Sequence, residues 1–179
     1  MTLSGIQWFA FPVKEYLLNN KYPWVGTIIS IVLVLDQFTK YLVEKRIRMY
    51  DVIPVLPGFF NLTHVRNKGA AFSLFSTMPD GFRSAFFITV TLVAVAALAV
   101  LIIKTRERLL VTAFSLIAGG AVGNVIDRIR FGEVVDFIQW YVKSYYWPSF
   151  NVADSAISVG VGLLEIDMLF RKQDAVKQA

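Results

Sequence analysis

The stretch SAFFITVTLVAVAALAVLII, residues 84–103, is 20 residues long and carries no charged side chain. An α-helix rises about 1.5 Å per residue, so these residues are enough to cross the roughly 30 Å hydrocarbon core of a bilayer. The short basic segment Lys104-Thr-Arg-Glu-Arg108 follows, and residues 109–126 are again uncharged. The pattern predicts two transmembrane helices joined by a tight turn.

The composition points to the same class of protein. The chain has 179 residues, of which 56% are hydrophobic and 17% are charged, whereas about a quarter of the residues of a soluble domain are charged. The absence of cysteine excludes disulfides and thiolate metal sites. The single histidine, His64, excludes a zinc site of the His-Glu-x-x-His type. For a membrane protein, the net charge of +5 indicates contact with anionic lipid headgroups and no role in nucleic-acid binding.

Two further stretches are apolar enough to span a membrane. Residues 24–43 contain Asp36 and Lys40 as exceptions, and residues 151–170 contain Asp154 near their start. Residues 1–23 mix charged and aromatic side chains, which is typical of an interfacial lead-in. We therefore expect an all-α membrane protein that forms a single domain over residues 1–179. Its four transmembrane helices are predicted near residues 24–43, 84–103, 109–126 and 151–170.

The segments between these spans lack a helical pattern. Residues 50–75 combine prolines and glycines with β-branched and aromatic side chains, and residues 128–150 are rich in aromatic side chains. Both segments predict short strands and loops outside the cytoplasm, at the membrane interface. Within them, residues 50–66 are a candidate cradle for an extended ligand. Residues 140–150 are a candidate lid that moves when a substrate enters.

Four spans place both termini on one side of the membrane, together with the turn at residues 104–108. The opposite side receives the end of the first span, the start of the second, the end of the third and the start of the fourth. Polar side chains that are scattered along the chain therefore converge at one membrane face. They are Asp36, Lys40, Asn67, Asn124, Asp127, Arg128, Asp136, Asn151 and Asp154.

Two carboxyl groups in this set are the candidates for chemistry. Asp136 lies in Val-Val-Asp-Phe-Ile, and Asp154 ends Phe150-Asn-Val-Ala-Asp. A carboxylate near hydrocarbon requires a partner or a proton. If the two groups meet, they share a proton, so one activates a water while the other polarises a carbonyl. Proton-coupled transport uses such pairs as well, and a structural alternative is that Asp154 caps the fourth helix, a task for which Asn151 is already suited.

The remaining polar residues also have structural alternatives. Asp36 and Lys40 are spaced i, i+4, so they form an ion pair that helps the first span to insert or that supports the site. Gly69 follows Asn67 in a turn that requires positive φ. The small residues of Gly119-Gly-Ala-Val-Gly123 allow close helix packing. Beyond them, Arg128 pairs with Asp127 or positions another carboxylate.

Five motifs, in order along the chain, resemble the lipoprotein signal peptidase (signal peptidase II) family of bacterial inner-membrane aspartyl proteases. They are Asp36-Gln-Phe-Thr-Lys40, Asn67-Lys-Gly-Ala-Ala-Phe72, Gly120-Ala-Val-Gly-Asn-Val-Ile-Asp-Arg128, Val135-Asp136-Phe137 and Phe150-Asn-Val-Ala-Asp154. The resemblance implies that Asp136 and Asp154 form a catalytic dyad. It also implies a substrate pocket lined by Asn67, Gly69, Asn124, Arg128 and Asn151, and a supporting scaffold of Asp36, Lys40 and Asp127.

The same resemblance implies an activity and a location. The family removes the signal peptide of a prolipoprotein by cutting before a diacylglyceryl-modified cysteine, and it requires no metal or other cofactor. The site is expected at the periplasmic face, with both termini in the cytoplasm. The expected partners are the prolipoprotein substrate, membrane lipid and cyclic peptide inhibitors such as globomycin, and the protein is expected to be a monomer.

Three other functions compete with this one. A small proton- or ion-coupled transporter would place polar residues along a transmembrane path instead of at one face. A non-catalytic lipid-binding or assembly subunit would tolerate Asp136→Asn, with lipid binding intact. An intramembrane serine protease lacks a suitable pair, because the only histidine, His64, lies in a loop with no nucleophile motif nearby.

Overall fold

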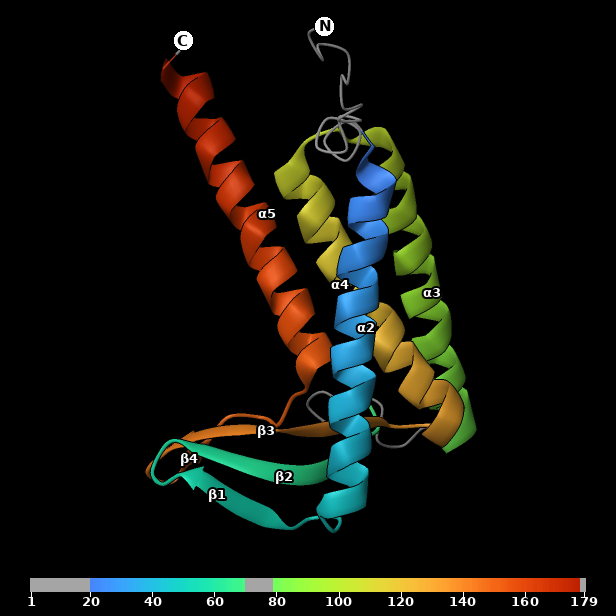
Figure 1. Cartoon of the computed structure of the whole chain (residues 1–179), viewed down its shortest axis with the longest axis vertical. Helices are drawn as coiled ribbons and strands as arrows, with labels where there is room; N and C mark the ends of the chain where they lie inside the picture. The colour runs from blue at the N-terminus through green and yellow to red at the C-terminus, as the bar shows by residue number, and fades with distance from the viewer. Residues whose placement is uncertain (1–19, 70–78, 178–179) are drawn as a thin grey trace, which may run out of the picture.

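The computed structural model describes residues 20–69 and 79–177 of the chain. In this part, four long helices rise from one side of a small sheet that lies across their ends (Figure 1). The helices are α2 (Lys21–Arg46), α3 (Asp80–Lys104), α4 (Arg108–Phe131) and α5 (Val152–Lys177). The strands are β1 (Val52–Leu56), β2 (Phe60–Asn67), β3 (Val134–Val142) and β4 (Tyr145–Tyr146). Most of the expected lead-in at residues 1–23, and the end of the 50–75 segment, lie outside the described residues.

Local signals determine where the helices begin and end. Asn20 caps α2, because its side-chain oxygen accepts a hydrogen bond from Tyr22 N at 3.3 Å. Helix α4 ends at Gly132, which has a φ of +74° and donates its N–H to Arg128 O at 2.9 Å. Asp127 and Arg128 therefore lie in the last turns of α4. The predicted span near residues 109–126 lies within α4, which continues beyond the uncharged run to its glycine cap.

Three helices of the described part, namely α2, α3 and α4, are long and apolar enough to cross a membrane. They correspond to the first three predicted spans. Helix α5 is 26 residues long but is not one of the three. Its second half carries Glu165 and Asp167, which lower its apolar character. The fourth span at residues 151–170 stays a prediction.

The four strands form one antiparallel sheet in the order β1-β2-β3-β4. Strand β2 contains a bulge between Leu62 and Val65, because three steps along β2 match two steps along β3. The predicted strand character of both segments is confirmed. Residues 140–150, the candidate lid, continue β3 and add β4, with Trp140 opposite Phe60 and Tyr141 opposite Tyr146. Their movement when a substrate enters stays a prediction.

Helix α4 is the centre of the bundle and packs against α2, α3 and α5. Small residues permit this close packing, as the sequence predicts. A Cβ atom added at Gly119 would lie 3.2 Å from Val32 Cβ on α2. A Cβ atom added at Gly120 would overlap the backbone carbonyl oxygen of Ala153 on α5. The first turn of α5, which carries Asp154, is thus held directly against α4.

Gly120→Ala is expected to destabilise the protein by about 1–3 kcal/mol, because the added methyl group meets backbone that has no room to move. Gly162→Ala is the matched control, since a Cβ atom at this α5 position has no neighbour within 4 Å. Thermal unfolding in detergent should show a lower Tm for Gly120→Ala only. Equal Tm values for the two variants would contradict the close packing of α4 on α5.

Candidate active site

Asp136 lies on β3, opposite Val65 of β2, and its side chain is only 2% exposed. Both carboxyl oxygens accept a hydrogen bond from an asparagine amide. Asn67 Nδ2 donates to Oδ2 at 2.9 Å, and Asn151 Nδ2 donates to Oδ1 at 2.8 Å. Strand β3 therefore places the side chain of Asp136 next to the first residues of α5.

Asp154 lies in the first turn of α5 and is half-buried. It exchanges two hydrogen bonds with Asn151: Asp154 N donates to Asn151 Oδ1 at 2.9 Å, and Asn151 N donates to Asp154 Oδ2 at 3.3 Å. This reciprocal arrangement is a capping box. The structural alternative, in which these residues cap the helix, is therefore real. It does not separate Asp154 from the site, because Asn124 Nδ2 also donates to its Oδ1 at 2.8 Å.

Asn151 connects the two acidic residues. Its side chain is fully buried, and its Nδ2 also lies 3.2 Å from Asn124 Oδ1 and from Val135 O. Because its Oδ1 accepts the capping bond from Asp154, its Nδ2 must point toward Asp136. One buried amide thus sets the relative position of the two carboxyl groups.

The other two asparagines are oriented in the same manner. Asn67 Oδ1 accepts from Gly69 N at 2.8 Å, so its Nδ2 is free to reach Asp136. Asn124 Oδ1 accepts from Lys40 Nζ at 3.1 Å, so its Nδ2 points to Asp154. In each of these asparagines, the partner of the oxygen decides the direction of the N–H groups.

A buried ionic cluster lies behind these amides. Lys40 Nζ is 2.8 Å from Asp36 Oδ2 and 2.8 Å from Asp127 Oδ2, and all three side chains are buried. The predicted Asp36–Lys40 pair is confirmed. The two carboxylates also bind backbone N–H groups: Asp36 accepts from Ala153 N at 2.9 Å, and Asp127 accepts from Val135 N at 3.2 Å. The cluster therefore ties α2 and α4 to Ala153 and Val135, the residues that precede Asp154 and Asp136.

Gln37 is a member of this cluster that the sequence reasoning missed. Its Nε2 lies 3.1 Å from Asp36 Oδ2 and 3.0 Å from Asp127 Oδ1. The available signal was a polar side chain beside Asp36 within an otherwise apolar span. The amide bridges two carboxylates that would otherwise repel one another.

Gly69 and Arg128, two of the predicted pocket residues, both lie beside Phe87 of α3. Gly69 has a φ of +80°, as predicted, and a Cβ atom there would lie 2.6 Å from the ring of Phe87. The Arg128 guanidinium lies 5.3 Å from the centroid of the same ring. Among the described residues, Arg128 is not within ion-pair distance of Asp127, because Asp127 pairs with Lys40. A cavity of about 570 Å³ beside Arg128 lies between the start of α3 and the end of α4, and neither Asp136 nor Asp154 is part of its lining.

The environment of Asp136 favours its protonated form. Burial raises the pKa of Asp136, and the nearby Asp154 raises it further, to about 7. Hydrogen bonds from Asn67 and Asn151 oppose this rise, because they stabilise the charged form. Near neutral pH, Asp136 therefore carries its proton in a large fraction of the molecules. A protonated carboxyl group that lies near a second carboxyl group is a common feature of acid–base sites.

Comparison with known proteins indicates which family the chain belongs to. A family profile described as "Signal peptidase (SPase) II" matches residues 28–170. A "Lipoprotein signal peptidase" of Geobacter metallireducens is 54% identical over 154 residues, covering 85% of this chain and 94% of the relative. Another of that name, from Syntrophus aciditrophicus, is 45% identical over 147 residues, covering 81% and 91%.

A solved structure has a fold similar to that of this chain. A bacterial membrane enzyme determined by the in meso method superposes with a TM-score of 0.76 at 35% identity, covering 86% of this chain and 92% of that one. The profile match includes the β3 and α5 segments that carry the two acidic residues. The chain therefore belongs to the signal peptidase II family, a family of aspartic peptidases.

Proposed function

We propose that this protein removes the signal peptide from diacylglyceryl-modified prolipoproteins, with Asp136 and Asp154 as the catalytic dyad. Family membership supports the reaction class. The observation that carries the assignment of residues is the position of Asn151, which donates from its side chain to Asp136 and from its backbone to Asp154. Two carboxyl groups held by one buried residue are arranged to share a proton.

The proposed reaction uses the two carboxyl groups in different roles. Asp154, as the carboxylate, takes a proton from a water whose oxygen attacks the carbonyl carbon of the scissile amide. Asp136, in its acid form, donates a hydrogen bond to the carbonyl oxygen as negative charge develops there. When the C–N bond breaks, the proton taken by Asp154 passes to the leaving nitrogen. The pocket residues Asn67, Gly69, Asn124, Arg128 and Asn151 orient the substrate and the dyad.

The position of the dyad suits a lipidated substrate. Asp136 and Asp154 lie where the helical bundle meets the sheet, at one end of the three candidate spans (Figure 1). Acyl chains of a substrate can stay in the bilayer while its scissile amide reaches this end. The candidate spans and the bacterial family indicate a multi-pass protein of the inner membrane. We further propose a periplasmic site, cytoplasmic termini, a monomeric enzyme and inhibition by globomycin-type cyclic peptides.

The rate of cleavage is expected to fall as the pH rises through about 7, because Asp136 then loses the proton that polarises the carbonyl. Asn67→Ala should move this alkaline limb to higher pH. The bond from Asn67 lowers the pKa of Asp136, so its removal raises that pKa. The measurement is kcat/KM as a function of pH.

Asn61→Ala is the matched control, since Asn61 lies on the same strand but donates to Gln139 instead of the dyad. Its alkaline limb should coincide with that of the wild type. A limb that moves to lower pH in Asn67→Ala, or that stays in place, would contradict the assignment of the proton to Asp136.

The substrate class is tested with two forms of one prolipoprotein, one with the diacylglyceryl group on its cysteine and one without. Purified full-length protein in detergent should cleave only the lipidated form, and mass spectrometry should place the cut directly before the modified cysteine. Equal cleavage of both forms would show that the enzyme does not recognise the diacylglyceryl group. Absence of cleavage by a folded preparation would refute the proposed function.

A further inference from the structure

Helix α5 has an exposed side that begins at Asp154. Residues spaced i, i+4, i+7 and i+11 lie on one face of an α-helix. Counted from Asp154, these positions are Ser158, Val161 and Glu165. All three are exposed, and α5 is the outermost helix at one side of the bundle (Figure 1). One member of the dyad therefore lies at the start of an exposed helix face.

The opposite side of α5 packs on α4. Ala153 and Gly160 are buried there, and a Cβ atom added at Gly160 would lie 2.7 Å from Ala113 O of α4. Each residue turns an α-helix by about 100°, so the exposed residues and the neighbouring Gly162 are rotated by about 100–160° from Gly160. They therefore lie away from α4. We name this side the α5 face; it consists of Ser158, Val161, Gly162 and Glu165.

The α5 face differs from a helix surface that meets only lipid. Helix α3 has such a surface, because residues 84–103 carry no charge and Val93 is 66% exposed. The α5 face instead presents a hydroxyl group and a carboxylate, which are costly against hydrocarbon. It also contains Gly162, where an added Cβ atom would have no neighbour within 4 Å. A glycine lowers helix stability but lets a second helix approach closely, so this face is suited to a helical partner.

The packing of α4 on α5 gives the level of Glu165 along the bundle. The two helices run in opposite directions, and their close contact sets Gly160 level with Ala113. Continuing this register by five residues places Glu165 level with Arg108, the first residue of α4. Glu165 thus lies at the end of the bundle away from the sheet, about 16 Å along α5 from Asp154.

A signal peptide matches the length and the charge of this face. It consists of a positively charged segment, an apolar core of about 7–15 residues and the cleavage site. As a helix, the core is roughly 10–22 Å long, a range that includes the distance from Asp154 to Glu165. When the cleavage site lies at the dyad, the positive segment therefore reaches the level of the Glu165 carboxylate.

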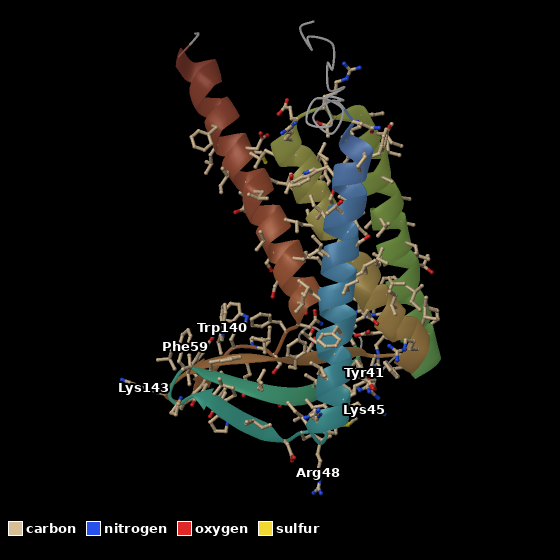
Figure 2. All side chains as sticks on the ribbon, in the orientation of Figure 1. Tyr41, Lys45, Arg48, Phe59, Trp140 and Lys143 are labelled. Carbon is tan, nitrogen blue, oxygen red and sulfur yellow. The ribbon has the colours of Figure 1, made fainter. Side chains whose placement is uncertain are left out.

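The other exposed charges favour this direction of binding. Figure 2 shows Lys45 and Arg48 at the end of α2 and Lys143 at the tip of the sheet, so exposed basic side chains lie near the sheet. The α3–α4 connection, residues 104–108, carries three basic residues and one acidic residue. Both regions repel a positive segment, whereas the carboxylate of Glu165 attracts it.

We propose that the α5 face binds the signal peptide of the substrate, which runs antiparallel to α5 from Glu165 to the dyad. The apolar core packs on Val161 and Gly162, and the Glu165 carboxylate pairs with a basic side chain of the positive segment. This binding mode rests on the proposed function and adds to it a site for the part of the substrate that leaves. Glu165 is a specificity residue and takes no part in bond cleavage.

Disulfide cross-linking tests where the signal peptide lies. The chain has no cysteine, so Ser158→Cys introduces a single thiol on the α5 face. The partner is a lipidated prolipoprotein that carries a second, unmodified cysteine in the middle of its apolar core. After mild oxidation of the full-length protein and the substrate in detergent, a disulfide should form between them. Val93→Cys is the matched control, because Val93 is exposed on α3 and should give little cross-linked product.

Glu165→Gln tests the role of the carboxylate. For a substrate with lysines in its positive segment, kcat/KM should fall about two- to five-fold through a higher KM, as expected from the loss of an exposed ion pair. For a substrate in which glutamines replace these lysines, the variant should equal the wild type. Glu165→Lys should cleave a substrate with glutamates in this segment faster than the wild type does. Glu107→Gln is the matched control, since Glu107 is exposed at the same end of the bundle but not on α5, and it should keep the wild-type preference.

The results that contradict this binding mode differ from the result that contradicts the proposed function. If the wild type cleaves the substrate but position 158 cross-links no better than position 93, the signal peptide does not lie on the α5 face. If Glu165→Gln loses activity equally toward the lysine and glutamine substrates, or loses kcat instead of raising KM, Glu165 does not recognise the positive segment. If the folded wild type cleaves no lipidated prolipoprotein, the proposed function fails and this binding mode fails with it.

Discussion

Asp136→Asn and Asp154→Asn are each expected to lower cleavage of a lipidated prolipoprotein by roughly 10²–10⁴-fold, the usual contribution of a positioned acid or base. An amide at position 154 cannot take a proton from water. An amide at position 136 can still form hydrogen bonds, but it cannot act as an acid. Only its oxygen can accept a hydrogen bond, so it cannot accept from both Asn67 and Asn151 as the two carboxyl oxygens of Asp136 do. The two losses act on one reaction step, so the double variant should be little worse than either single variant.

The measurement is kcat/KM with purified protein in detergent, together with Tm to confirm folding. Asp51→Asn is the matched control, because Asp51 is an exposed acidic residue outside the site. Its activity should equal that of the wild type. Substantial cleavage by either dyad variant would refute the dyad. Independent, multiplicative losses in the double variant would indicate that the two groups do not act together.

Lys40→Met is expected to destabilise the protein by about 3–5 kcal/mol, the typical result of removing one partner from a buried ionic group. The side chains of Asp36 and Asp127 are at most 1% exposed, and Lys40 is within 2.8 Å of both. Without the ammonium group, two carboxylates stay buried with only polar neighbours to offset their charge. The activity should fall as well, because Lys40 sets the direction of the Asn124 amide that donates to Asp154.

Thermal unfolding in detergent is the primary measurement for this variant. Lys45→Met is the matched control, since Lys45 lies on the same helix but is exposed, and its Tm should stay near that of the wild type. Adding Asp36→Asn to Lys40→Met should restore part of the lost stability, because one fewer buried charge is left unpaired. An unchanged Tm in Lys40→Met would mean that the cluster contributes nothing to stability. A double variant that is less stable than Lys40→Met would contradict its ionic character.

Much of the site was predictable because the order of the spans limits which residues can meet. A short connection between two uncharged runs brings the ends of distant segments together, so Asn67, Asn124 and Asn151 were expected at one face. The structure confirms that they lie together, each with its amide on a carboxyl group of the dyad. The i, i+4 spacing of Asp36 and Lys40 likewise predicted their ion pair, since helix geometry alone determines it.

Helix boundaries and strand partners were less predictable. Apolar runs report where a chain can lie in lipid, whereas α4 continues past its uncharged run to its glycine cap at Gly132. Residues 140–150 were expected as strands and loops that act as a lid, but their composition does not indicate which strand they pair with. Pairing with β2 and β4 depends on a register that only the folded chain provides.

The amino-acid sequence by itself determined that this is a membrane protein and that its polar groups converge at one membrane face. It also indicated which two acidic residues are candidates to share a proton. These conclusions depend only on hydropathy and on the spacing of residues, which can be read along the chain. The tertiary structure alone decided that Lys40 pairs with Asp127, that Gln37 joins this cluster and that each asparagine turns its N–H groups toward the dyad. Hydrogen-bond direction depends on which partner occupies the oxygen, and those partners come from other elements.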